Sequence, residues 1–120
     1  MRILIVEDHA DTATILEKLV RKHGHFCEIA PTIASALAAA AQDRFNIALI
    51  DLGLPDGNGA VLAPMFEPKG IKCIALTGDS LSAEQLGQAS GFIAALVKPI
   101  NFTDLTVLLT KVGASESPRG

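Results

Sequence analysis

The chain has 120 residues and a formal net charge of −3; 49% of its residues are apolar and only 19% are charged. This length suits one domain with its own core, and high hydrophobicity with low net charge excludes intrinsic disorder. Ten Lys and Arg against 13 Asp and Glu leave no basic surface for direct nucleic-acid binding. Charges, Gly or Pro interrupt every apolar stretch before the roughly 20 residues that a membrane-spanning helix needs. With two Cys and no signal-peptide pattern, we expect a reduced, cytoplasmic protein.

Short β-branched apolar runs alternate along the chain with longer stretches of helical period. In chain order, this pattern predicts a strand at 3–6, a helix at 11–24, a strand at 26–29, a helix at 31–41, a strand at 47–50, a short helix at 60–66, a strand at 71–76, a helix at 82–91, a strand at 94–97 and a helix at 101–112. Strict alternation of this kind is typical of one doubly wound α/β domain with a parallel sheet. We expect residues 114–120 to be a polar tail or truncated linker.

Several of the predicted helices carry capping signals at their first residues. Asp11 is a candidate N-cap for the first helix. Ser82, with Gln85 three residues later, resembles a capping box for the fourth helix. Asn101 with Asp104 resembles the start of the last helix.

Residues with reactive or charged side chains follow four of the five predicted strands. They are Glu7 and Asp8 after the first strand, Asp51 after the third, Thr77 after the fourth and Lys98 after the fifth. In open parallel sheets, ligands bind beyond the carboxyl ends of the strands. We therefore expect three carboxylates, one hydroxyl and one ammonium to meet at one edge, where like charges are costly unless a cation is present.

This set of groups is suited to phosphoryl transfer. Carboxylate oxygens around a partly open site favour Mg²⁺, which keeps several waters for exchange with phosphate oxygens. The Asp51 carboxylate is ionised at neutral pH without a general base and would attack phosphorus to give an aspartyl phosphate. Lys98 would offset charge on the phosphoryl oxygens, and Thr77 would donate a hydrogen bond to one of them.

Four segments together resemble the signature of two-component response regulator receiver domains, also called CheY-like domains. They are Val6-Glu7-Asp8, the stretch DLGLPDGNG at 51–59, Leu76-Thr77-Gly78 and Lys98-Pro99. The resemblance covers about residues 2–112, and we place the receiver domain at 1–113. It implies a flavodoxin-like (βα)5 fold with strand order 2-1-3-4-5.

The resemblance also implies a role for each matching residue. Asp51 would be the phosphoacceptor, Glu7 and Asp8 the acids that bind Mg²⁺ together with Asp51, and Gly53 the donor of a main-chain carbonyl to the metal. Thr77 would be the switch hydroxyl, and Lys98 would pair with the phosphate. The peptide bond from this lysine to the following Pro99 is typically cis in the family. The implied partners are a histidine kinase or histidine phosphotransfer protein as phosphodonor, and a downstream protein on the face of helix four, strand five and helix five.

The sequence departs from the usual receiver pattern in two places. Ala95 occupies the position three before the lysine, where receivers usually carry an aromatic switch residue, so we expect coupling through the loop after strand four and helix four instead. The stretch from Gly59 to Thr77 is short, which predicts an abbreviated third helix. Residues 91–99 resemble receivers attached to hybrid sensor histidine kinases, which favours phosphorelay or kinase regulation over transcription.

Two other functions compete with this interpretation. A pseudo-receiver would keep the fold and bind a partner without phosphorylation. A small-molecule phosphatase would need a second catalytic acid or a substrate pocket that the sequence does not supply, so the enzymatic activity we expect is limited to self-phosphorylation and autodephosphorylation at Asp51.

Structural interpretations suffice for several other residues. Asp56 and Asp104 fit helix caps, His9 fits a solvated loop, and His25 fits the surface. Cys27 and Cys73 fall on strands that the implied order separates by about 14 Å, which excludes a disulfide and predicts free core thiols.

Overall fold

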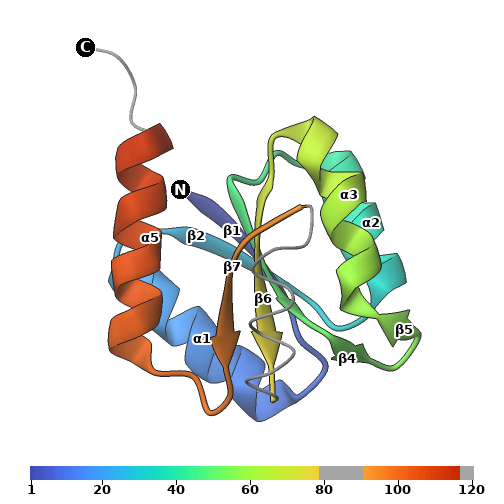
Figure 1. Ribbon diagram of the computed structural model, residues 1–120, viewed down its shortest axis with the longest axis horizontal. Coiled ribbons are helices and arrows are strands. Elements are labelled where there is room, and N and C mark those ends of the chain that lie inside the picture. The colour runs from blue at the N-terminus through green and yellow to red at the C-terminus, as the bar shows by residue number, and fades with distance from the viewer. Residues whose placement is uncertain (79–90, 117–120) are drawn as a thin grey trace.

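The computed structural model describes residues 1–78 and 91–116 and has a five-stranded parallel sheet at its centre (Figure 1). The spatial order is β2-β1-β3-β6-β7, formed by β1 (Arg2–Val6), β2 (Phe26–Ala30), β3 (Ile47–Asp51), β6 (Lys72–Thr77) and β7 (Phe92–Val97). Counting only these strands in chain order, this is the order 2-1-3-4-5. It confirms the flavodoxin-like α/β fold.

Helices cover both faces of this sheet (Figure 1). One face carries α1 (Ala10–Lys22) and α5 (Phe102–Glu116), and the other carries α2 (Ile33–Gln42) and α3 (Leu62–Phe66). Side chains along each strand alternate between the two resulting cores, as in β1, where Ile3 and Ile5 pack on the α1 side and Leu4 and Val6 on the α2 side. All of β3 is buried, because this central strand is covered on both faces.

The connection between β3 and β6 is short and contains little α-helix, as predicted. A two-stranded hairpin, β4 (Gly53–Leu54) with β5 (Gly57–Asn58), leads into a 3₁₀ turn, η1 (Gly59–Val61), before α3. A second 3₁₀ turn, η2 (Glu67–Lys69), ends the helical stretch before Gly70, which has a φ of 78°. The five-residue α3 still places Phe66, which is fully buried, in the core.

Several element boundaries differ from the sequence-based expectations. β7 begins at Phe92, two positions before the expected strand, because the buried Phe92 pairs beside Cys73 on β6. α5 continues to Glu116, past the expected end of the apolar stripe at Val112. The helix predicted at 82–91, with its capping box at Ser82 and Gln85, lies outside the described residues except for Gly91.

The starts of the helices also differ in detail. Asp11 is not an N-cap, since α1 begins at Ala10 and His9 holds the cap position without a side-chain hydrogen bond. Asn101 is the cap of α5: its Oδ1 accepts hydrogen bonds from the backbone N–H groups of Thr103 and Asp104 at 2.8 and 3.1 Å. Asp104 therefore lies in the first turn of α5, where its negative charge faces the positive end of the helix dipole.

Both cysteines are free thiols, as predicted. Cys27 on β2 and Cys73 on β6 are separated by β1 and β3. Cys73 is buried, and burial raises the pKa of its thiol to about 12; Cys27 is half-buried rather than a core residue, with a pKa raised by burial to about 11. Both thiols are therefore poor nucleophiles. None of the helices in the described ranges is long and apolar enough to cross a membrane.

Candidate functional site

The carboxyl ends of β1, β3, β6 and β7 bring together the residues singled out in the sequence. Glu7 directly follows β1, Asp51 is the last residue of β3, Thr77 is the last of β6, and Lys98 directly follows β7. Sheet register fixes their proximity, because Asp51 pairs with Leu76 and Thr77 pairs with Val97. Glu7, Asp51 and Thr77 are all buried, which is unusual for polar residues and marks this edge as a site.

Lys98 bridges two of the buried acids. Its Nζ lies 2.9 Å from Glu7 Oε1 and 3.0 Å from Asp51 Oδ2. Burial favours a neutral lysine, but the hydrogen bonds and the attraction of these two carboxylates outweigh burial and raise the pKa of Lys98. The lysine therefore stays charged and partly neutralises the two acids.

The two bridged acids differ in their readiness to ionise. Burial, and then the neighbouring Asp51 carboxylate, raise the pKa of Glu7. Burial acts in the same direction on Asp51, but hydrogen bonds with Glu7, the Lys98 ammonium and the Gly53 N–H outweigh burial and lower the pKa of Asp51. Asp51 is thus the acid that is held ionised, as a nucleophile must be.

Gly53 contacts Asp51 through its backbone. Its N–H donates to Asp51 Oδ1 at 3.0 Å, so each oxygen of the Asp51 carboxylate has its own donor. The hairpin β4–β5 carries Gly53, and its base is closed by the Gly59 N–H, which donates to the Leu52 carbonyl at 3.0 Å. A Cβ at position 59 would overlap the Asp51 carbonyl oxygen, so only glycine fits there.

Asp8 has a side-chain oxygen whose surroundings fit a cation site. Its Oδ1 is buried and has no hydrogen-bond partner among the described residues, although His9 Nδ1 lies 3.5 Å away. One ligand atom each from Glu7, Asp8, His9 and Asp51 lie within 4.8 Å of one another. A buried oxygen without a partner, beside two further carboxylates, fits a site for a hard divalent cation that accepts oxygen ligands.

His9 lies closer to the site than the sequence indicated. Its side chain is 70% exposed, as expected for a solvated loop, but its Nδ1 is 3.5 Å from both Glu7 Oε2 and Asp8 Oδ1. The sequence signal for this proximity was that His9 directly follows Glu7 and Asp8. Mg²⁺ prefers oxygen ligands, so His9 is at the rim of the cluster and the carboxylates are the groups suited to hold such an ion.

The remaining predicted residues take different positions. The Lys98-Pro99 bond is cis, as the family resemblance implied, and the Lys98 N–H donates to the Thr77 carbonyl at 2.6 Å. Ala95 lies beside Ala75 on β6 and is half-buried against the core on the α2 side, so no aromatic ring occupies the switch position. Asp56 is not in the carboxylate cluster; its side chain accepts hydrogen bonds from the start of α2.

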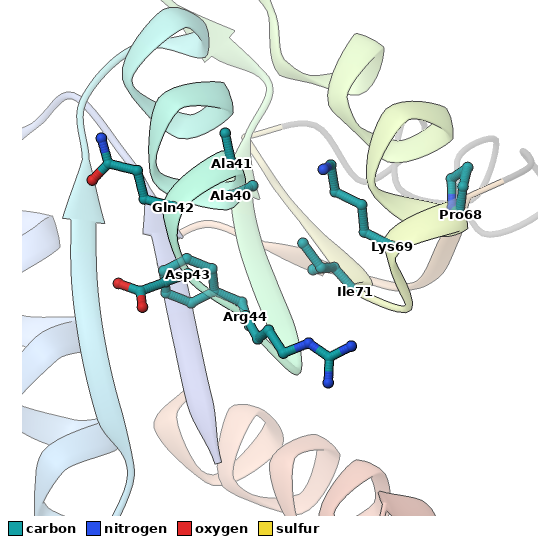
Figure 2. Close-up of a pocket in the computed structure, with 9 residues that line it drawn as sticks. Ala40, Ala41, Gln42, Asp43, Arg44, Pro68, Lys69 and Ile71 are labelled. Carbon is teal, nitrogen blue, oxygen red and sulfur yellow. The ribbon is translucent and has the colours of Figure 1, made fainter.

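Two surface hollows lie at different distances from this chemistry. A hollow of about 460 Å³ opens at the opposite end of the sheet, between the end of α2 and η2, with Arg44 and Lys69 at its walls (Figure 2). A second, largely apolar hollow of about 450 Å³ adjoins the site and is lined by Thr12, Ile15, Leu16, Lys98, Pro99, Ile100 and Phe102. Of these two hollows, the second is the one beside the site, because Lys98 lines it and also contacts Asp51.

Comparison with known proteins agrees with this geometry. The family model for the response regulator receiver domain matches residues 3–110. The chain is 30% identical over 112 residues to the two-component response regulator PhoP of Pseudomonas aeruginosa, covering 91% of this chain and 50% of PhoP, and 25% identical to the transcription factor SKN7 of Saccharomyces cerevisiae, covering 91% and 18%. The chain thus spans half or less of the curated relatives it matches.

Solved structures show the same fold. A CheY-like receiver domain protein from Methanospirillum hungatei JF-1 has a TM-score of 0.84 at 33% identity, with 96% of this chain and 95% of that chain covered. A two-component response regulator from Clostridium difficile has a TM-score of 0.88 at 18% identity, with 98% and 99% covered, and supports the fold alone. From its family match, fold and strand-end residues, the chain belongs to the response regulator receiver domains.

Proposed function

We propose that the domain accepts a phosphoryl group from a phosphohistidine onto Asp51, with Mg²⁺ held by Glu7, Asp8, Asp51 and the main-chain carbonyl of Gly53. When bound, Mg²⁺ supplies positive charge to the phosphoryl oxygens. The observation that carries the proposal is the buried Asp51, ionised and held by Lys98, beside the unsatisfied Asp8 oxygen.

The chain's own groups can perform the transfer. An Asp51 oxygen bonds to phosphorus as the N–P bond of the phosphohistidine breaks, and the electron pair of that bond stays on the imidazole of the donor. Lys98, 3.0 Å from Asp51, pairs with a phosphoryl oxygen, and Thr77 donates its hydroxyl to another. Hydrolysis of the aspartyl phosphate by water is the only enzymatic turnover included in this proposal.

A small phosphodonor tests the acceptor assignment directly. In Mg²⁺ buffer, acetyl phosphate should add one phosphoryl group to the wild type, measured by intact mass, and none to Asp51→Asn. Asp104→Asn, a matched change of an exposed acid on α5, should be phosphorylated like the wild type. Phosphorylation of Asp51→Asn to the wild-type level would show that Asp51 is not the acceptor.

The phosphodonor would dock on the apolar hollow beside Lys98. Ile15 on α1 is 49% exposed and Phe102 on α5 is 45% exposed, so two large apolar side chains flank the approach to the site. A histidine kinase or histidine phosphotransfer protein that packed there would place its phosphohistidine near Asp51. These proteins are the partners we propose.

The output would use the face of β7 and α5, together with the helix predicted at 82–91, which lies outside the described residues except for Gly91. Ile93, Val97 and Val107 are exposed apolar side chains on β7 and α5. Phosphorylation would draw Thr77 inward and shift an existing equilibrium of the following loop. With Ala95 at the aromatic switch position, the coupling would pass through that loop and helix four to a downstream protein.

Attachment to a hybrid sensor histidine kinase is a finer part of the proposal. Residues 91–99 support it, as does the likeness to a sensor protein from Polaromonas sp. JS666, with a TM-score of 0.83 at 26% identity over 92% of this chain and 94% of that chain. A kinase core upstream in the full-length gene product would establish it. A cytoplasmic location, which is typical of receiver domains, is also part of the proposal.

A pseudo-receiver is the alternative function, favoured by Ala95 and the short segment before β6. It would bind its partner through the same fold without phosphorylation. Mg²⁺-dependent binding of beryllofluoride separates the two: it is expected of a phosphoacceptor and absent from a pseudo-receiver.

A further inference from the structure

The hairpin β4–β5 directly follows β3, the strand that ends at Asp51, and its tip contacts the start of α2. Gly53 pairs with Asn58 and Leu54 with Gly57, so Pro55 and Asp56 form the tip. Asp56 Oδ1 accepts a hydrogen bond from the Ile33 N–H at 2.9 Å, and Oδ2 accepts one from the Ala34 N–H at 3.1 Å. These hydrogen bonds lower the pKa of Asp56, so the carboxylate is ionised at the positive end of α2.

Asp56 accepts hydrogen bonds from two of the backbone N–H groups in the first turn of α2. A helix begins with four backbone N–H groups that have no partner within the helix. In α2, the Ser35 N–H donates to Thr32 Oγ1 at 2.9 Å and the Thr32 N–H donates to Ser35 Oγ at 3.0 Å, which is a capping box. Asp56 satisfies the other two, so the cap of α2 comes partly from a loop more than 20 residues away.

Gly57, the residue after the hairpin tip, lies close to the same helix. Gly57 has a φ of 143°, and a Cβ there would lie 3.2 Å from Ile33 Cδ1. Glycine therefore permits the close approach that brings Asp56 onto the Ile33 and Ala34 N–H groups. Asp56 and Gly57 therefore both lie against the start of α2, and the hydrogen bonds come from Asp56.

The same hairpin carries the residue that contacts the phosphoacceptor. Gly53 pairs across the hairpin with Asn58, and its N–H donates to Asp51 Oδ1 at 3.0 Å. We infer that Asp56 is a positioning residue: by fixing the hairpin tip to α2, it sets the backbone conformation at Gly53, whose N–H orders Asp51 Oδ1 and whose carbonyl is the one assigned to Mg²⁺. The metal part of this inference rests on the proposed function; the contact between Gly53 and Asp51 does not.

Three variants separate positioning from simple stabilisation. Asp56→Ala removes both hydrogen bonds to α2, Asp56→Asn keeps one acceptor oxygen, and Thr32→Ala removes the other half of the same helix cap without touching the hairpin. Thermal unfolding confirms that each variant folds. Hydrogen exchange of the Gly53 amide is measured by NMR without metal, and the Mg²⁺ affinity by calorimetry, since the chain has no Trp or Tyr to report binding.

We expect Asp56→Ala to speed exchange of the Gly53 amide and to weaken Mg²⁺ binding about threefold to tenfold. This is at or below the loss of affinity of about 10- to 100-fold that follows when a residue hydrogen-bonded to a metal-binding group is removed. Asp56→Asn should recover part of both effects, and Thr32→Ala should show neither. Equal effects of Asp56→Ala and Thr32→Ala, or unchanged Gly53 exchange in Asp56→Ala, would overturn the inference. A wild type that does not bind Mg²⁺ would contradict the proposed function instead, while the metal-free exchange would still decide the role of Asp56.

Discussion

Replacing Asp8 with Asn tests whether the acidic cluster is built around a cation. Ligand oxygens of Glu7, Asp8 and Asp51 lie within 4.8 Å of one another, and Asp8 Oδ1 is buried with no hydrogen-bond partner among the described residues. Two unit charges at that separation repel by about 3 kcal/mol at an effective dielectric constant of about 20. Lys98 and the 27% exposure of the Asp8 side chain reduce this repulsion, so we expect a net effect of about 1 kcal/mol.

Without metal, Asp8→Asn should therefore be more stable than the wild type, with its melting temperature raised by about 4 °C. With Mg²⁺ the order should reverse. Mg²⁺ at about 100 times its dissociation constant would stabilise the wild type by about 2.7 kcal/mol, and the variant would lose most of that gain with its metal ligand.

Thermal unfolding followed by circular dichroism, in EDTA and in Mg²⁺, measures both differences. Glu28→Gln, which removes one negative charge from an exposed position on β2, is the matched control and should change neither. Destabilisation of Asp8→Asn in EDTA, or a Mg²⁺ gain equal to that of the wild type, would refute the reasoning.

Three further predictions concern the fold and the site. Phe66→Ala should lower the free energy of unfolding by about 3–5 kcal/mol, measured by urea titration, because Phe66 is fully buried and α3 is too short to rearrange around the cavity. Gly59→Ala should abolish phosphorylation by acetyl phosphate or prevent folding, because its Cβ would overlap the Asp51 carbonyl; a fully active variant would contradict this packing. Burial, followed by the positive charges at the Met1 amino group and His23, lowers the pKa of His25 from 6.5. The unfolded chain then binds more protons, so stability should fall as the pH drops below about 6.5, and His25→Gln should show a smaller fall in urea midpoint between pH 7 and 5.

Much of the site could be predicted because it depends on topology. In a parallel sheet, all strands end at the same edge, so identifying the strands was enough to bring Glu7, Asp51, Thr77 and Lys98 together. The apolar run at 47–50 is typical of a central strand covered on both faces, and all of β3 is buried.

Contacts between loops could not be predicted in this way. Asp56 was interpreted as a helix cap, which is confirmed, but the sequence did not indicate that the capped helix is α2, more than 20 residues earlier in the chain. Asp11 was expected to cap α1 and does not, since the helix begins one residue earlier, at Ala10. The position of His9 beside two carboxylates depends on side-chain directions that no periodicity encodes.

The sequence by itself determined the order of strands and helices, the residues at each strand end and the free state of the cysteines, because these follow from local pattern and from the spacing of strands. Only the tertiary structure decided which acid is held ionised, which oxygen lacks a hydrogen-bond partner within residues 1–78 and 91–116, and which helix anchors the hairpin after Asp51. Those properties depend on distances of a few ångströms between groups far apart in the chain. Such distances are set by how the layers pack on the sheet.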